Sequence, residues 1–209
     1  MFRKLFNADN PLMITMSRIT DCIFLSLFWL LGSFPLLTLG ASTAALYDAV
    51  HGGFRKQDKH PWSKFLKSFR QNLLPGLVPS LVHLLVLAVT GWGMIRLWNG
   101  AVAGSVSWML FAAGAFGAVV LLGILGVMFP MLSRFENSLG ALLKNTLFMA
   151  LANLPRTVAL GILNGAVLLL SLRFIFPVFF LPATAALLST FLLEPMFKPY
   201  MPEEDSAVV

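Results

Sequence analysis

Long apolar segments alternate with short polar connections along most of this chain. Five apolar segments approach the length of about 20 residues that crosses the hydrocarbon core of a bilayer as a helix. They cover residues 19–34, 73–97, 106–132, 157–172 and 174–193. A sixth, residues 33–50, is interrupted by Pro35 and Gly40 and contains a run of small residues. We therefore predict an all-α, polytopic membrane helix bundle with about five or six membrane elements and amphipathic helices on its cytoplasmic side.

The segment at residues 33–50 has two interpretations. It is either a short second crossing or a re-entrant element, which a membrane tolerates only where protein covers it. If residues 19–50 return to the side that they left, every lysine and arginine except Arg96 and Arg173 lies on one face of the membrane. The positive-inside rule favours this arrangement, with both termini in the cytoplasm. Both interpretations place residues 33–50 inside the bundle.

Residues 62–73 have a clear amphipathic pattern. The apolar stripe comprises Trp62, Phe65, Leu66, Phe69 and Leu73, and the polar face comprises Lys64, Lys67 and Gln71. This pattern predicts a helix on the cytoplasmic leaflet, with its lysines near anionic lipid headgroups. Alternatively, the helix packs on the bundle itself.

The connection between residues 129 and 156 carries a helical pattern of its own. Pro130 and Pro155 bracket room for a helix of about 36 Å, at roughly 1.5 Å per residue. Six leucines follow the i, i+3, i+4 spacing of one helical face: Leu139, Leu142, Leu143, Leu147, Leu151 and Leu154. We therefore expect an amphipathic cytoplasmic helix between the two prolines.

Composition supports the membrane assignment. Hydrophobic residues make up 58% of the chain and charged residues 11%, whereas a soluble domain is usually about 25% charged. The net charge of +6 would suggest a nucleic-acid partner in a soluble protein. Here the basic residues flank apolar segments, so we interpret them as an orientation signal and expect no nucleic acid. The one cysteine excludes an internal disulfide, and the first apolar segment lacks a convincing cleavage site, so we expect it to be a retained span.

We expect one integral membrane domain over residues 1–209. Its parts are an interfacial arm (1–18), a first span with a short or re-entrant second element (19–50), a basic cytoplasmic loop and helix (51–72), a helical hairpin (73–132), a cytoplasmic amphipathic connection (133–156), a second helical hairpin (157–195) and a tail (196–209). The arm either contacts lipid headgroups or is a frayed terminus.

No residues have the spacing of a catalytic, cofactor or metal site. His51 and His60 lie near Asp48 and Asp58, but in no recognised ligand pattern, and the neighbouring lysines would repel a cation. No serine lies in a nucleophile-elbow context. We therefore expect a protein that is not an enzyme and needs neither cofactor nor metal.

One polar cluster is the strongest candidate for an interaction site. Its residues are Arg134, Phe135, Glu136, Asn137, Asn145 and Arg156. Arg134 and Glu136 cannot face each other two positions apart on a helix, so Arg156 is the expected partner of Glu136. The pair either fixes the cytoplasmic end of the bundle or belongs to a docking surface for a protein or an anionic headgroup.

A second candidate site is a transport path marked by His83 and Asn164. His83 lies within an apolar span, where a histidine relays protons, touches a substrate or hydrogen-bonds a neighbouring helix. Asn164 lies inside the sequence Gly161-x-x-x-Gly165, a spacing typical of close helix contacts. Gly114, Gly117, Gly123 and Gly126 indicate similar packing in the preceding span.

Three blocks carry a resemblance to a known family. They are SFPLLTLGASTAALY (33–47), SKFLKSFRQN (63–72) and RFENSLGALLKNTLFMALANLPRT (134–157). Together they resemble the YesL family of bacterial multi-pass membrane proteins, which has no established biochemical activity. The matching positions are Pro35, Gly40, Tyr47, Phe69, Asn72, Arg134, Glu136, Asn137, Asn145, Pro155 and Arg156. The resemblance implies a protein of the bacterial cytoplasmic membrane that works beside an oligosaccharide uptake system.

These observations lead to a ranked expectation. The leading function is that of a non-enzymatic accessory or regulatory partner of a carbohydrate uptake or sensing system, in contact with a sugar permease or a sensor kinase. The alternative is a small transporter of a neutral solute. A third hypothesis is lipid interaction through the basic helix at residues 62–73, since the bilayer and its anionic headgroups are themselves expected partners.

Overall fold

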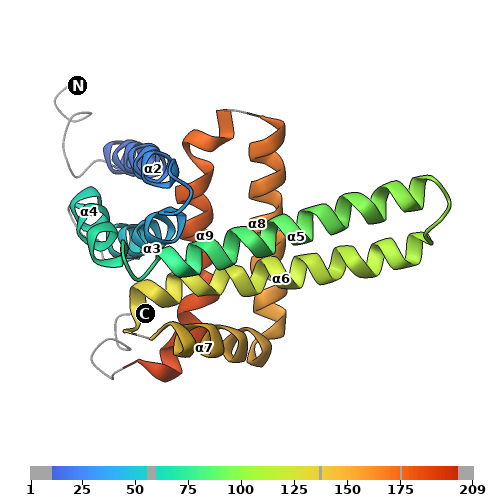
Figure 1. Ribbon diagram of the computed structural model, residues 1–209. Helices are drawn as coiled ribbons and strands as arrows, with labels where there is room; N and C mark the ends of the chain where they lie inside the picture. The colour runs from blue at the N-terminus through green and yellow to red at the C-terminus, as the bar shows by residue number, and fades with distance from the viewer. Residues whose placement is uncertain (1–10, 56–59, 137, 175, 202–209) are drawn as a thin grey trace.

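A computed structural model of the chain describes residues 11–55, 60–136, 138–174 and 176–201. These residues are almost entirely helical and include no strand, so the predicted all-α bundle is confirmed. The helices are α2 (Pro11–Ser33), α3 (Leu39–Val50), α4 (Pro61–Asn72), α5 (Leu77–Val102), α6 (Trp108–Arg134), α7 (Leu139–Ala152), α8 (Leu154–Arg173) and α9 (Leu181–Phe197), with a π-helical turn η1 (His51–Arg55) and short 3-10 turns η2 (Phe176–Phe179) and η3 (Lys198–Tyr200) (Figure 1).

Four of the described helices are long and apolar enough to cross a membrane. They are α5, α6 and α8 over their whole lengths and α2 over Met16–Ser33. α2 begins at Pro11, a residue suited to a first helical turn. Residues 11–18 of the predicted interfacial arm are therefore part of the first long helix, and residues 1–10 lie outside the described part.

α3 occupies the centre of the bundle, as predicted for the interrupted segment. Its 12 residues span only about 18 Å, well short of the roughly 30 Å hydrocarbon core. Nine of them are buried, and α2, α4, α5, α6 and α9 all pack against it. Gly40 permits this closeness, because a Cβ there would lie within 3 Å of Phe129, Ser80 and the carbonyl of Gly76.

α5 and α6 form a long hairpin that projects from the rest of the molecule (Figure 1). The side chain of Ser107 caps α6 by accepting a hydrogen bond from the amide of Leu110 at 3.3 Å. Trp98 and Trp108 meet near the tip, with ring centroids 5.9 Å apart. Pro130 lies inside α6, which continues to Arg134. The helix that lies between the two prolines therefore begins only at Leu139.

α8 and α9 run side by side across the hairpin (Figure 1). α6 and α8 touch backbone to backbone, because a Cβ on Gly161 would lie within 3 Å of the Val119 carbonyl and one on Gly123 within 3 Å of the Thr157 carbonyl. These two glycines confirm the predicted close helix packing. Gly117 has nothing within contact distance of such a Cβ, so it takes no part in this packing.

α7 differs from its predicted form in length and in orientation. It has 14 residues, about 21 Å, rather than filling the interval between the two prolines. Its buried residues are Leu142, Thr146, Met149 and Ala150. The other predicted stripe leucines on α7 are exposed, namely Leu139, Leu143, Leu147 and Leu151. The buried face is therefore rotated around the helix, away from most of the leucine stripe.

α4 packs on the bundle through part of its apolar stripe. Phe65 is buried and stacks between Phe28 and Phe69, with ring centroids 5.9 and 6.1 Å away. Trp62 and Leu66, from the same stripe, are exposed. The alternative of a helix packed on the bundle is thus confirmed for Phe65, and the exposed residues leave an apolar edge outside.

Candidate functional site

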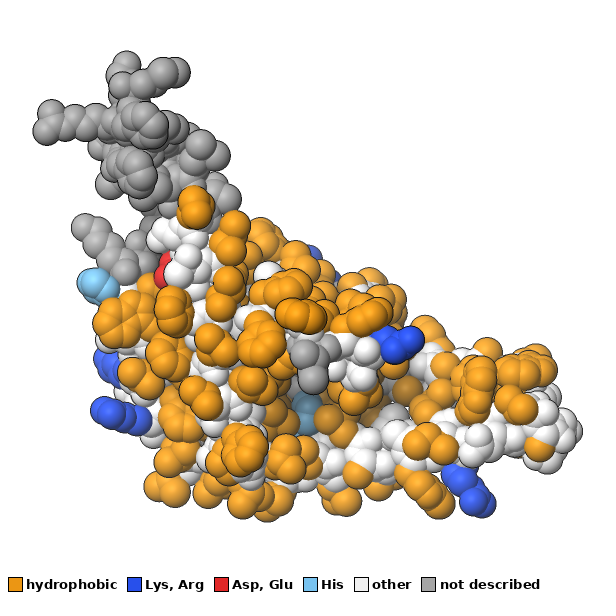
Figure 2. Space-filling model, turned by 90° about the horizontal axis from the view of Figure 1, so that it is seen from above, with side chains coloured by type: hydrophobic (Ala, Val, Ile, Leu, Met, Phe, Trp, Pro, Cys, Tyr) orange, Lys and Arg blue, Asp and Glu red, His pale blue; other side chains and the backbone are white. Residues whose placement is uncertain are grey.

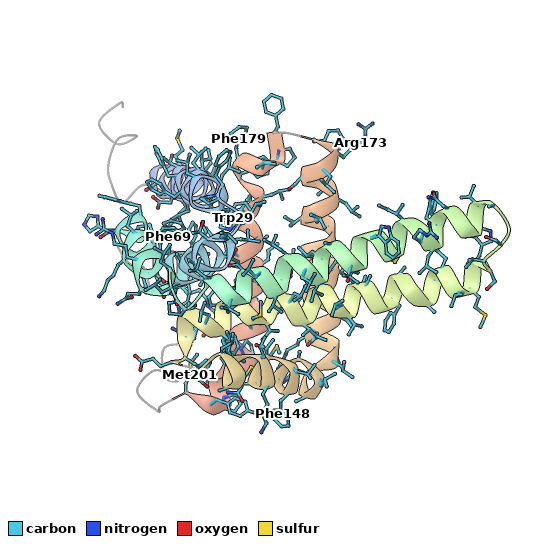
Figure 3. The ribbon with its side chains drawn as sticks, viewed as in Figure 1. Trp29, Phe69, Phe148, Arg173, Phe179 and Met201 are labelled. Carbon is cyan, nitrogen blue, oxygen red and sulfur yellow. The ribbon has the colours of Figure 1, made fainter. Side chains whose placement is uncertain are left out.

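A cavity of about 440 Å³ lies between α2, α3, α5, α6, α8 and α9. Its size falls within the range of roughly 300–1,000 Å³ typical of small-molecule sites. Figure 2 shows the hydrophobic face of the molecule hollowed near its centre, with a histidine side chain deep between apolar groups. In Figure 3, Trp29, one of the lining residues, lies toward α2 and α3, while Arg173 and Phe179 mark the end where α8 turns toward α9.

His83 and Asn164 both line this cavity. His83 comes from α5, and its ring lies 4.9 Å from the ring of Phe129 on α6. Asn164 comes from α8 and donates a hydrogen bond to the carbonyl of Leu122 on α6 at 3.4 Å. The structure therefore brings the two predicted path residues to one site.

Two further polar lining side chains are hydrogen-bonded to protein groups. The indole of Trp29 donates to the hydroxyl of Thr43 at 3.0 Å. The hydroxyl of Ser189 donates to the carbonyl of Ala186 at 2.7 Å. These side chains have their hydrogen bonds satisfied within the protein, so the contacts hold them in place in the cavity wall.

A buried network of charged and polar residues adjoins the cavity through Tyr47. Glu194 of α9 has no exposed surface. Its carboxylate accepts a hydrogen bond from the Tyr47 hydroxyl at 2.7 Å and from Arg134 Nη2 at 3.1 Å, and lies 3.4 Å from Nε2 of His51. α3, η1, α6 and α9 each supply one member of this network. Because a buried charge is costly unless it is paired, the network fixes how these elements meet.

The protonation of Tyr47 suits its role as a donor. Burial, and then the negative charge of Glu194, raise the pKa of the Tyr47 phenol well above its usual value. The phenol therefore keeps its proton and donates it in the hydrogen bond to the carboxylate.

Arg55 of η1 also contacts α9, one helical turn before Glu194. Its guanidinium donates to the carbonyl of Thr190 at 3.3 Å and lies over the ring of Phe191 at 5.1 Å. Arg18 of α2 likewise donates to the carbonyl of Gly53 in η1. Together these contacts tie η1 to the helices on both sides.

The predicted interaction cluster is divided between the interior and the surface. Arg134 points inward to Glu194 and is only 12% exposed, so it is a structural residue and not a docking residue. Phe135 packs edge-on against Phe197, with centroids 5.6 Å apart. Glu136 and Asn145 are exposed, and Asn137 lies outside the described residues.

The expected pair between Glu136 and Arg156 does not form among the described residues. Arg156 is exposed and donates instead to the side chain of Asn153 at 3.3 Å. Glu136 precedes α7 and Arg156 follows it. The 14 residues of α7, about 21 Å long, therefore separate the two side chains.

Phe135 and Asn145 line a small cleft beside α7. The cleft has a volume of about 180 Å³ and is bordered also by Phe148 and Tyr200. Phe148 and Met201 are labelled at this end of the molecule, opposite Arg173 (Figure 3). The exposed apolar residues of α7 continue outward from the cleft. We call Leu139, Leu143, Leu147, Phe148 and Leu151 the outer α7 face.

The two histidines considered as metal ligands lie in different environments. His51 is buried against Glu194, while His60 is exposed before α4 and packs on Trp62. Asp48 pairs with Lys64 at 3.5 Å. Within the described chain, no three metal-binding side chains gather.

Sequence reasoning missed the central role of Glu194. The predicted last apolar segment, residues 174–193, ends just before Glu194, whereas α9 continues to Phe197. A lone acidic residue between apolar residues within a helix is the signal that could have identified it, since buried charges in such segments usually have partners.

Comparison with known families places part of the chain. Residues 22–94 match the family model described as "Protein of unknown function, DUF624". Comparisons with curated proteins and with solved structures give no match. The matched stretch covers under half of the chain and includes Tyr47, His51 and His83, but neither Glu194 nor α7. The family description assigns no activity to these residues. The match therefore shows a similarity over residues 22–94 and gives no information about function.

Proposed function

We propose that this protein is a non-enzymatic accessory or regulatory partner of a carbohydrate uptake or sensing system in the bacterial cytoplasmic membrane, with both termini in the cytoplasm. The outer α7 face makes the contact, and the partner is a sugar permease or a sensor kinase. The observation that carries the proposal is the outward orientation of this face. A helix that turns five large apolar side chains away from its own bundle presents them to lipid or to another protein.

The cleft beside α7 favours a protein partner. Protein interfaces are dominated by a few large side chains that insert into well-packed pockets. The volume of about 180 Å³ and the aromatic walls of Phe135, Phe148 and Tyr200 suit one inserted side chain. Exposed Glu136 and Arg156 flank α7 and supply polar groups of opposite charge at the edge of the interface.

The link to carbohydrate uptake comes from the resemblance of three sequence blocks to the YesL family. The third block, residues 134–157, contains α7 together with Glu136 and Arg156. One of the three blocks that carry the resemblance therefore also presents the outer α7 face.

Co-purification from native membranes in mild detergent tests this proposal. Three proteins are compared: the unaltered chain, the α7 variant Leu147→Gln/Leu151→Gln, and the control Leu85→Gln/Val89→Gln. The control alters two exposed apolar residues of α5. Recovery of a sugar permease or sensor kinase in near-stoichiometric amount with the first and third proteins only supports the proposal. Equal recovery with all three, or no such partner with any, contradicts it.

A second candidate function is the transport of a small neutral solute. The convergence of His83 and Asn164 on one cavity favours it. Purified protein in proteoliposomes should then accelerate the flux of glycerol, and His83→Phe should abolish the acceleration. Equal flux of glycerol with and without the protein would contradict this function for glycerol.

A further inference from the structure

The side chains that line the central cavity are mostly apolar, and this limits the classes of ligand that can bind there. Most of its lining is aliphatic or aromatic, and all six surrounding helices contribute. Four polar lining side chains already bind protein groups: Thr43, Tyr47, Asn164 and Ser189. A ligand in this cavity therefore meets an apolar surface over most of its area.

His83 supplies the hydrogen-bonding atom in this apolar setting. Its Nδ1 is buried and has no hydrogen-bond partner within the described residues. The ring is held against Phe129, so its position is set before a ligand arrives. Because the ring also lines the cavity, a ligand hydroxyl that reaches the imidazole gains a hydrogen bond in an apolar setting.

These features exclude a free sugar from the cavity. Each ligand hydroxyl that is buried without a partner weakens binding by about tenfold, and a sugar carries several. A charged ligand is also disfavoured, because the lining residues include no aspartate, glutamate, lysine or arginine to pair with it. An apolar chain, in contrast, gains from leaving water in proportion to its area.

We infer that the cavity is a binding site for a neutral amphiphile, a molecule with an apolar chain and a single hydroxyl group that hydrogen-bonds to the imidazole of His83. The chain contacts the aliphatic walls, and the hydroxyl sets its orientation. The site is independent of the docking role, since the outer α7 face contributes none of its lining.

Trp29 makes this inference measurable, because it is the one tryptophan among the lining residues. The other four are replaced by Phe to give a protein whose fluorescence comes from Trp29 alone. In lipid nanodiscs, this protein is titrated with 11-bromo-1-undecanol and with 1-bromoundecane, whose bromine quenches indole fluorescence on contact. Size-exclusion profile and helical circular dichroism confirm that each variant is folded.

We expect saturable quenching by the bromoalcohol, at a concentration about threefold to tenfold lower than for the bromoalkane, the range that one net hydrogen bond provides. His83→Leu should equalise the two probes, His83→Gln should preserve the preference, and Ala185→Phe, which fills the cavity, should abolish saturation. Quenching that rises without saturation for both probes, a preference that survives His83→Leu, or displacement of the bromoalcohol by maltose would overturn the inference. Retention of a co-purified partner by His83→Leu would show that the docking role stands separately.

Discussion

The hydroxyl of Tyr47 donates a 2.7 Å hydrogen bond to the carboxylate of Glu194, although the two residues are 147 positions apart. This contact joins the central helix α3 to the last helix α9 inside the bundle. Arg134 binds the other carboxylate oxygen at 3.1 Å, so α6 is tied into the same point. The buried carboxylate of Glu194 and its two partners therefore join three helices of the bundle at one point.

Replacing Glu194 should lower the free energy of unfolding more than replacing an exposed acidic residue does. Glu194→Ala leaves Arg134 buried without its carboxylate, a change that typically costs about 3–5 kcal/mol. Tyr47→Phe should cost less, about 1–2 kcal/mol, because it removes one hydrogen bond and keeps the ion pair. Unfolding of the purified protein by a denaturing detergent measures both variants.

The matched control for this experiment is Glu136→Ala, since Glu136 is exposed. Its free energy of unfolding should stay within about 0.5 kcal/mol of the original value. If Glu194→Ala behaves like Glu136→Ala, the network does not hold the bundle together.

The crossing of α6 and α8 should be sensitive to one methyl group at one glycine and tolerant at another. A Cβ on Gly161 would collide with the Val119 backbone, whereas a Cβ on Gly165 would sit 3.6 Å from a Leu122 side-chain atom, an ordinary contact. Gly161→Ala should therefore lower the Tm of the purified protein clearly, and Gly165→Ala should leave it nearly unchanged or raise it slightly. Equal shifts for the two variants would argue against this crossing.

α7 provides a test of its own orientation. Leu142 is 1% exposed and Leu147 is 48% exposed. Leu142→Ala should cost about 2–5 kcal/mol of stability, the usual result of emptying a packed site. Leu147→Ala should cost well under 1 kcal/mol while weakening partner capture, because about half of the residue is exposed. The reverse order of effects would mean that the leucine stripe faces the bundle after all.

Hydrophobic patterning predicted the helices well and their faces poorly. Segment length and composition were sufficient for α2, α5, α6 and α8, and the small residues of α3 indicated its buried place. The leucine stripe indicated a helix at α7 but not its orientation. In a membrane protein an apolar face can meet either protein or lipid, so periodicity alone does not decide between them.

The polar site was predictable only in part, for a related reason. His83 and Asn164 stood out because each lies inside an apolar segment, and the fold brings them to one cavity. The partner of Arg134 could not be found from local spacing, since Glu194 is 60 positions away. The prediction paired Glu136 with Arg156 because both lie near the same connection, whereas the length of α7 separates them.

Site-specific photo-crosslinking at Phe148 tests the docking proposal most directly. Phe148 and Phe116 are both exposed phenylalanines, at 65% and 62%, but only Phe148 belongs to the outer α7 face. A benzophenone amino acid is placed at either position and activated in living cells. We predict a defined crosslink from position 148 to a sugar permease or sensor kinase, with only lipid adducts from position 116. The same pattern of adducts from both positions would contradict the proposal that α7 docks a partner.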